Sequence, residues 1–331
     1  MPMTTTAATS ATTVEDLPAD VLACALRRLD GRSLAAASCA TAGLRALAAD
    51  PATWRALCLA RWPSLSLLSS SSSSISPQRL FADAFPFPCC APPNTAAAAP
   101  LAGNLPADLP TLPAELVSAV DLYHAGAPLL SRAVETATSS SWFLTSPFRV
   151  DAVVDSSKTP APTIALPGGA GAIAAAEMEL SWVLIDPLAG RAVNVSSRRP
   201  VAVDRHWYTG DTLVRYAVVL GGCKFEATVT CSEEAAPGSV VVREISLAVE
   251  DADGAAVGGE GALRLVAAAM AGPRKGGEGQ EEVAKRRYEE FVRSKRGRKE
   301  SKARKEVLVD LCCSAVSAVA VLSFIAAVVL R

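Results

Sequence analysis

The sequence is poor in the residues from which most catalytic and metal sites are built. Its 331 residues include two histidines, His124 and His206, and 5% aromatic residues. None of the nine cysteines has the C-x-x-C spacing of a structural zinc site. An odd number of irregularly spaced cysteines favours reduced thiols in a cytosolic setting over a disulfide framework. We therefore expect no metal and no other cofactor.

Several charge and targeting signals are also missing. The formal net charge is −1, so the chain lacks the basic excess typical of nucleic-acid-binding proteins. The opening residues MPMTTTAATSATTV have neither the basic stretch nor the apolar run of a secretory signal. The G-x-S-x-G element of α/β hydrolases is absent, so Asp204, His206 and the many serines are not expected to form a hydrolytic site. We expect a protein that is not an enzyme.

What the chain does contain is a series of segments of contrasting composition. Residues 1–13 predict a disordered leader, and residues 14–63 predict a small helical domain. The range 64–114 contains six consecutive serines, and its stretch 91–113 contains six prolines. Because such a segment favours neither a helix nor a central strand, it predicts a linker.

Residues 115–272 change to the pattern of short strands separated by turns. Three candidate hairpins lie at 115–132, 181–197 and 213–230, and a further strand at 239–251. A helix is expected after them, with Gly272 at its end. The spacing predicts a mainly antiparallel, sandwich-like β domain, so that the whole chain belongs to the α+β class.

The last fifty residues predict a charged helix followed by an apolar one. Residues 281–306 form the basic segment, with eleven Lys or Arg against three Glu between Lys285 and Lys305. Residues 307–330 are apolar apart from Asp310, and twenty uncharged residues run from Leu311 to Leu330. A helix of that length spans about 30 Å, the thickness of a bilayer core. We expect a tail anchor that holds the protein on the cytosolic face of a membrane. The alternative is a nuclear or cytosolic protein whose basic run is an import signal.

The helical domain begins with a recognisable start signal. Asp16 is placed to cap the first helix, and Pro18 suits its first turn because a missing N–H is harmless there. Leu22, Leu26 and Leu29 fall on one face of this helix.

Two further helices are predicted in this domain. Ser33 is placed to cap a second helix that continues through Thr41, and Asp50 followed by Pro51 begins a third helix that contains Trp54. Three short helices with few large side chains bury little surface. We therefore expect part of the core of this domain to be supplied by a partner.

The stretch LPADVLACALRRLDGRSLAAASCATAGLRALAADPATW resembles an F-box in its opening, its leucine spacing and its closing tryptophan. The resemblance implies binding to a Skp1-type adaptor, and through it to a cullin and a RING subunit of an SCF-type ubiquitin ligase. The residues that it implies for this contact are Leu17, Pro18, Asp20, Leu22, Leu26, Leu29, Leu34 and Trp54.

The remainder resembles the second half of plant F-box proteins that end in a hydrophobic tail. Segments such as SWFLTSPFRVD and LSWVLIDPLAGRAVNVSSRRPVAVDRHW carry this similarity. It implies that the β domain recruits an unknown protein target. Two alternatives remain open: a lectin-like carbohydrate-binding module, and a membrane-anchored Skp1-binding scaffold outside a cullin complex.

Overall fold

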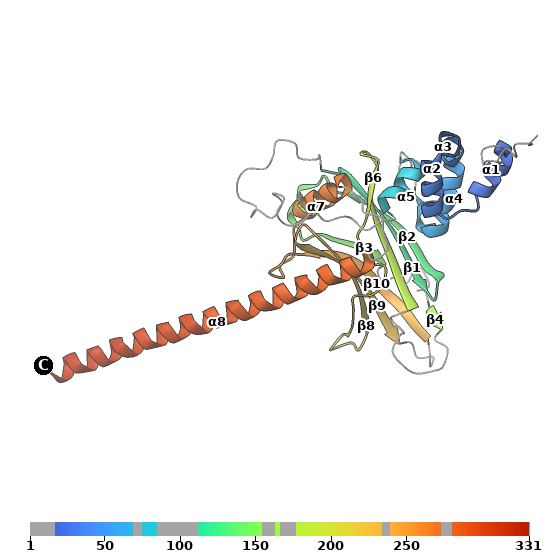
Figure 1. The fold of residues 1–331 in the computed structure, drawn as a ribbon. Helices are drawn as coiled ribbons and strands as arrows, with labels where there is room; N and C mark the ends of the chain where they lie inside the picture. Colours follow the sequence, from blue (N-terminus) through green and yellow to red (C-terminus); the bar gives the residue numbers. More distant parts are fainter. Residues whose placement is uncertain are drawn as a thin grey trace, which may run out of the picture.

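A computed structural model describes most of the chain. The described ranges are 17–68, 75–84, 112–153, 163–165, 177–233, 239–272 and 280–330. Within them, two antiparallel sheets lie between an N-terminal group of helices and one long C-terminal helix (Figure 1). The predicted α+β class is confirmed. The predicted leader, residues 1–13, lies outside the described residues, as does Asp16.

The N-terminal helical unit contains more helices than the sequence suggested. Its elements are α1 (Ala19–Leu26), α2 (Gly31–Ala40), α3 (Ala42–Ala48), α4 (Pro51–Arg61), the 3-10 helix η2 (Pro63–Leu67) and α5 (Pro77–Ala84). The single helix expected across Thr41 is wrong. Thr41 has an extended backbone, and its Oγ1 accepts a hydrogen bond from Leu44 N at 3.2 Å, which caps α3. Asp30 caps α2 in place of Ser33, whose N–H it accepts at 2.8 Å.

Helix α5 lies inside the range that the sequence predicted as a linker. Leu80 and Phe81 are buried, because this helix packs against α4 and β6. The segment is therefore part of the folded unit, although proline and serine dominate the sequence around it.

Neighbouring strands are antiparallel in both sheets. The four-stranded sheet has the order β2-β1-β5-β6, and the second sheet has the order β3-β10-β9-β8-β7, with β4 paired to β10. The first comprises β1 (Glu115–His124), β2 (Ala127–Ala137), β5 (Met178–Asp186) and β6 (Arg191–Asn194). The second comprises β3 (Arg149–Val153), β4 (Thr163–Ala165), β7 (Ala202–Arg205), β8 (Thr212–Leu220), β9 (Cys223–Glu233) and β10 (Ser239–Glu250).

All three predicted hairpins are confirmed by the strand pairing. β1 pairs with β2, β5 with β6, and β8 with β9. Their turns need left-handed backbone, and glycine adopts it without a Cβ clash. Gly221 and Gly222 have φ values of 56° and 80°, and Gly126 has a φ of 78°. These local requirements explain why the hairpins could be found from the sequence.

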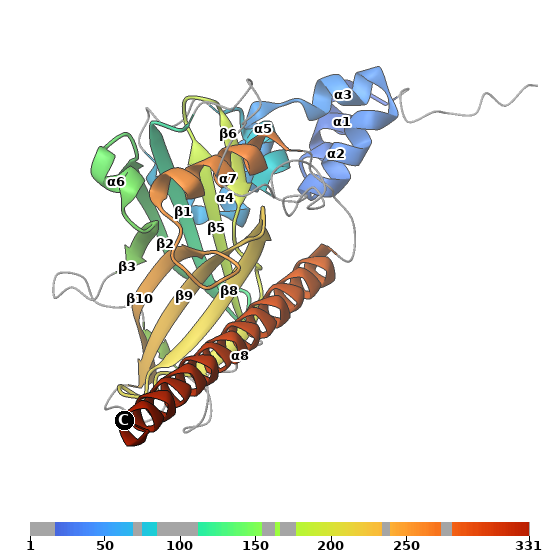
Figure 2. The same ribbon diagram turned by 90° about the vertical axis from the view of Figure 1, so that its left-hand side faces the viewer.

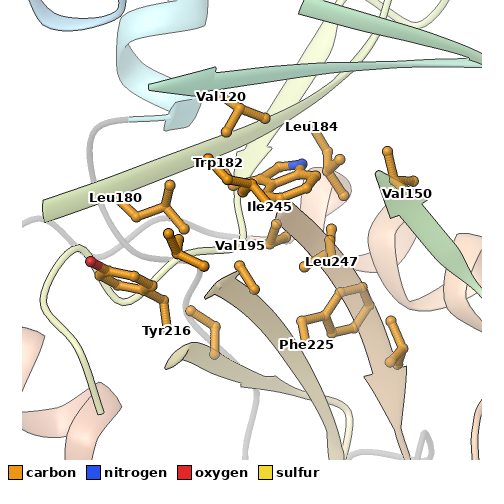
Figure 3. Close-up of a cluster of buried hydrophobic side chains, with 14 of the residues drawn as sticks. Val120, Val150, Leu180, Trp182, Leu184, Val195, Tyr216, Phe225, Ile245 and Leu247 are labelled. Carbon is orange, nitrogen blue, oxygen red and sulfur yellow. The ribbon is translucent and has the colours of Figure 1, made fainter. Parts of the chain in front are cut away.

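The inner faces of both sheets contribute to one apolar cluster (Figure 3). Trp182 of the first sheet and Tyr216 and Phe225 of the second are each 0% exposed. Short helix α6 (Ser141–Thr145) and α7 (Gly259–Ala271) cover one end of the cluster, with Phe143 and Leu263 buried in it. Helix α7 ends before Gly272, as expected.

Helix α8 (Gln280–Val329) is continuous through the predicted basic and apolar segments (Figure 2). Its first part contacts β8, and the rest projects away from both sheets (Figure 1). It is the one described helix that is long and apolar enough to cross a membrane, judged by length and composition.

Candidate functional site

The predicted adaptor-binding residues fall into three groups by their exposure in the N-terminal unit. Leu17, Pro18 and Asp20 are exposed, and Leu17 retains 46% of its accessible surface. Leu22 and Leu29 are half-buried. Three others are in the core, with exposed fractions of 6% for Leu26, 0% for Leu34 and 1% for Trp54. The first group can contact a partner directly, and the buried group supports the helices that present it.

One exposed apolar residue of α1 was missed by the sequence analysis. Val21 is 49% exposed and shares the outward face of α1 with Cys24 and Ala25, which are exposed as well. The leucine stripe marked the buried face, so the opposite face was not considered. The sequence does indicate this second apolar face, because the apolar residues at positions 21, 24 and 25 fall on one side of a helix. Together with Leu17 and Pro18, they form what we call the α1 patch.

Behind the α1 patch, the helical unit has an aromatic core. Trp54 Nε1 donates to the carbonyl of Ala48 at 2.7 Å. The ring centroid of Phe81 lies 5.4 Å from that of Trp54 and 5.7 Å from that of Trp62. Gly31 is in contact with the same phenyl ring, because a Cβ on Gly31 would lie 2.1 Å from Phe81 Cζ. Helix α5 therefore completes a core that α1–α4 alone would leave open.

The four-stranded sheet completes the rest of that core. The outward side chains Val117, Ala119, Val183, Ile185 and Ala192 belong to one cluster with the buried residues of the helical unit. Trp62 Nε1 also donates to Ser181 Oγ at 2.8 Å, and Tyr123 Oη donates to the carbonyl of Arg61 at 2.6 Å. The core that we expected from a partner is thus supplied in part by the same chain.

We call the contact between the helical unit and the four-stranded sheet the joint. It also contains a buried carboxylate. Asp121 is 0% exposed and accepts hydrogen bonds from Ser64 N at 2.8 Å, Ser64 Oγ at 2.6 Å and Ser131 Oγ at 2.7 Å. Burial raises the pKa of the Asp121 carboxyl, and the hydrogen bonds from Ser64 and Ser131 oppose that rise. A second carboxylate, Asp83, pairs with Arg191 at 2.8 Å.

The turn between β7 and β8 presents aromatic side chains to solvent. Trp207 is 89% exposed and Tyr208 is 79% exposed, with ring centroids 5.6 Å apart. The sequence did not distinguish core from contact at Trp182, His206 and Trp207. The structure assigns Trp182 to the core and Trp207 to the surface. We call residues 206–210 the aromatic turn.

The polar groups of the aromatic turn bond to the turn itself. His206 N donates to Asp211 O at 2.7 Å, and Thr209 N donates to His206 Nδ1 at 3.2 Å. Gly210 N donates to His206 O at 2.9 Å with a φ of 75°. Nearby Asp204 pairs with Arg215 at 2.8 Å. The turn is preorganised, and its rings are its main exposed feature.

Helix α8 is held on the outer face of the second sheet by charged side chains. Lys295 Nζ lies 2.5 Å from Glu250 Oε1, and Arg298 Nη1 lies 3.2 Å from Asp253 Oδ1. Phe291 of α8 is 7% exposed, so its side chain lies on the face of the helix that the protein covers. Burial raises the pKa of Tyr288, which faces Glu226 and Arg215. Among the described residues, no group of three His, Cys, Asp or Glu could hold a metal ion.

Comparisons with known proteins find relatives that match most of the chain in sequence. The chain is 36% identical over 289 residues to the probable F-box protein At2g36090 of Arabidopsis thaliana, covering 86% of this chain and 84% of the relative. It is 34% identical over 309 residues to the F-box protein At2g27310 of the same plant, covering 87% and 88%. The F-box protein At3g44326, also from this plant, is 36% identical over 300 residues, covering 85% and 80%.

The chain belongs to the F-box proteins, and the resemblance to plant members is confirmed. Membership supports a general role in substrate recognition and a non-catalytic adaptor kind of protein. No family model matches the chain, and no solved structure matches it.

Proposed function

We propose that this protein is the substrate-recognition subunit of an SCF-type ubiquitin ligase. The α1 patch binds a Skp1-type adaptor, which joins the chain to a cullin and a RING subunit. The observation that carries this proposal is the outward exposure of Leu17 and Val21 on a helical unit whose other side is closed by its own sheet. Such an apolar surface fits an interface that buries on the order of 1,600 Å².

In this proposal the chain contributes position and no bond chemistry. A target held by one end of a rigid unit meets the ubiquitin-charged enzyme at high effective concentration. The buried joint at Asp121 and Trp62 supports this role, since it fixes the helical unit against the sheet. A flexible connection would spread the target over a larger volume and lower its effective concentration.

The decisive test is a pull-down of the Skp1 adaptor with the full chain and with a Leu17→Ala/Pro18→Ala variant. We expect loss of Skp1 and of the cullin with the variant, because two exposed contacts are truncated. A Trp142→Ala variant is the matched control, since Trp142 is 76% exposed but lies on α6, outside the helical unit. Undiminished binding by the double variant would contradict the proposal. Skp1 without the cullin would favour the scaffold alternative.

For the target, we propose that the aromatic turn is the contact surface. Rigid, exposed Trp and Tyr side chains are typical anchors in protein interfaces, because ordering them costs little entropy. A carbohydrate site would also need polar groups beside the rings for sugar hydroxyls. The backbone N–H groups of His206, Thr209 and Gly210 and the His206 Nδ1 atom already form hydrogen bonds within the turn or to Asp211, which favours a protein target.

The target contact is tested by crosslinking from the turn in cells. A Trp207→Ala/Tyr208→Ala variant should lose the crosslinked proteins that the Leu17→Ala/Pro18→Ala variant retains, because the two surfaces act separately. A glycan-array signal that disappears with Trp207→Ala would instead favour the lectin-like alternative.

We further propose that residues 307–330 anchor the protein in a membrane. All described residues from 307 to 330 are exposed, so neither sheet covers this apolar segment. Resistance of the full chain to alkaline carbonate extraction is the expected result. Recovery in the soluble fraction would contradict it.

A further inference from the structure

The contact between α8 and the second sheet ends shortly before the apolar segment of α8 begins. Arg298, paired with Asp253, is the last residue of α8 that forms an ion pair with the folded unit. Every residue from Lys299 onward that the structure describes is exposed. Eight residues, 299–306, separate this contact from Val307, and at about 1.5 Å per residue they extend about 12 Å. The folded unit therefore ends close to the start of the apolar segment.

This short segment carries basic side chains on all sides of the helix. We call Lys299, Lys302, Arg304 and Lys305 the basic collar. At about 100° per residue, Lys302 and Arg304 point about 160° apart, and Lys299 and Lys305 lie about 120° apart. A helix that lies in the membrane plane needs one continuous apolar face. Ala303 is the one apolar residue among 299–306, so this segment does not have such a face.

The dimensions of a bilayer match this order of segments. The headgroup layers together add about 10–15 Å to a hydrocarbon core of about 30 Å, or about 5–8 Å on each side. Lys305 is two residues from Val307, about 3 Å along the axis. Because Asp310 interrupts the apolar segment, the core is filled by the twenty uncharged residues Leu311–Leu330, about 30 Å as a helix. Lys305 then lies about 9 Å before Leu311, and the long side chains of the collar reach the headgroups. Four basic and two acidic residues give the segment 299–306 a net charge of +2.

We propose that the basic collar binds anionic phospholipid headgroups of the membrane that contains the tail. The inference rests on the proposed membrane anchoring of residues 307–330. Lipid contacts around the helix, together with the sheet contact at Lys295 and Arg298, hold the folded unit at a fixed short distance from the bilayer. The turn Asp251–Gly254 then faces the membrane, because Asp253 of this turn pairs with Arg298, where α8 leaves the folded unit.

The test offers the full-length protein a choice between two vesicle populations. Neutral phosphatidylcholine vesicles and vesicles with about 30% phosphatidylserine carry different dyes and are separated after incubation. We expect the wild-type chain to favour the anionic vesicles by at least about tenfold, because each basic residue near the surface adds attraction to an anionic leaflet. The preference should vanish at about 1 M salt, where the screening length falls to about 3 Å.

A matched pair of variants separates the collar from general charge. Lys302→Gln/Arg304→Gln/Lys305→Gln should lose most of the preference for anionic vesicles. Lys285→Gln/Arg286→Gln/Arg293→Gln changes the same net charge on the same helix, at exposed positions. These lie at least fourteen residues before Val307, about 21 Å and thus beyond a screening length of about 8 Å. This control should keep the preference.

The outcomes distinguish the collar proposal from the anchor proposal. An equal distribution of wild-type chain that resists carbonate extraction overturns the collar and leaves the anchor intact. A chain found with neither population overturns both, and favours the alternative of a nuclear-import signal. Equal loss of preference in the two triple variants also overturns the collar. Skp1 binding is measured separately, so failure of the ligase proposal is distinguishable from all of these.

Discussion

The two helical parts of this protein are attached to the two sheets by different physics. The N-terminal helical unit covers the outer face of the four-stranded sheet with an apolar cluster and a few buried hydrogen bonds. Helix α8 crosses the outer face of the other sheet with exposed or half-buried ion pairs, such as Lys295 with Glu250, and with the single buried apolar side chain of Phe291 among its described residues. Figures 1 and 2 show the two attachments on different sides of the sheets.

The difference separates a permanent joint from a weaker one. Burial of apolar surface contributes about 25 cal/mol per Å², and it does not depend on salt in the way that ion pairs do. Partly exposed ion pairs contribute little each, about 0–1 kcal/mol. We infer that the helical unit and the sheets unfold together, whereas the first turns of α8 can detach without unfolding the rest.

The largest effect is expected at the apolar joint. Trp62→Ala removes a ring that is 2% exposed, together with the hydrogen bond to Ser181. The free energy of unfolding should fall by about 3–5 kcal/mol, as for other large-to-small changes of buried aromatic residues. Urea unfolding of the full chain in detergent, followed by near-UV circular dichroism, measures this. A loss below about 1 kcal/mol would mean that the joint contributes little to the fold.

The buried carboxylate of this joint predicts a pH dependence. The folded-state pKa of Asp121 is raised above its unfolded value, mainly by burial. Between these two pKa values the folded state keeps a proton that the unfolded state has lost, so stability falls as pH rises through that window. Asp121→Asn does not titrate, and its oxygen can still accept from Ser64 N and Ser131 Oγ while its NH2 group donates to Ser64 Oγ. Its unfolding free energy should therefore improve relative to wild type as the pH rises above about 3.9, the ordinary pKa of an aspartate carboxyl.

Asp121→Ala is the companion to that variant. It leaves Ser64 N and two hydroxyl groups without their acceptor, and should be about 1–3 kcal/mol less stable than Asp121→Asn at any pH, because neither variant titrates. Thermal unfolding across the pH range measures both variants. A constant difference between Asp121→Asn and wild type would show that Asp121 does not titrate with a raised pKa.

A smaller effect is expected at the ionic joint. Lys295→Met keeps the packing of the aliphatic stem but removes the ion pair with Glu250. Global stability should change by less than about 1 kcal/mol. Amide exchange in residues 282–298 should nevertheless become faster, and high salt should have a similar effect on the wild type. Lys299→Met, one turn further along, is the control and should leave exchange unchanged. Unaltered exchange in the Lys295 variant would place the attachment in the apolar contact of Phe291.

The same comparison explains what the sequence could predict. The hairpins followed from local turn chemistry, as at Gly221 and Gly222, and the helix start at Asp50 from its cap. The long apolar segment of α8 followed from its length. The position of α5 could not be predicted in this way, because its Phe81 packs against Gly31 and Trp54, which are far away in the sequence.

Candidate surfaces were harder to predict than strands or helices. The leucine spacing identified supporting residues such as Leu34 but not the exposed Val21. The joint at Asp121 depends on a register that pairs it with Ser131 and brings Ser64 close, and no local pattern encodes that contact. Likewise, Trp182 and Trp207 could not be assigned to core or surface until the strands were placed.

The smallest effect on stability is expected at the aromatic turn. Trp207→Ala removes a ring that is 89% exposed, so the free energy of unfolding should stay within about 0.5 kcal/mol of wild type. Trp62→Ala provides the opposite extreme for the same chemical change. Urea unfolding under the same conditions measures both. A loss at Trp207 approaching that at Trp62 would mean that the ring stabilises the fold, and the turn would then be a structural element and not a contact surface for the target.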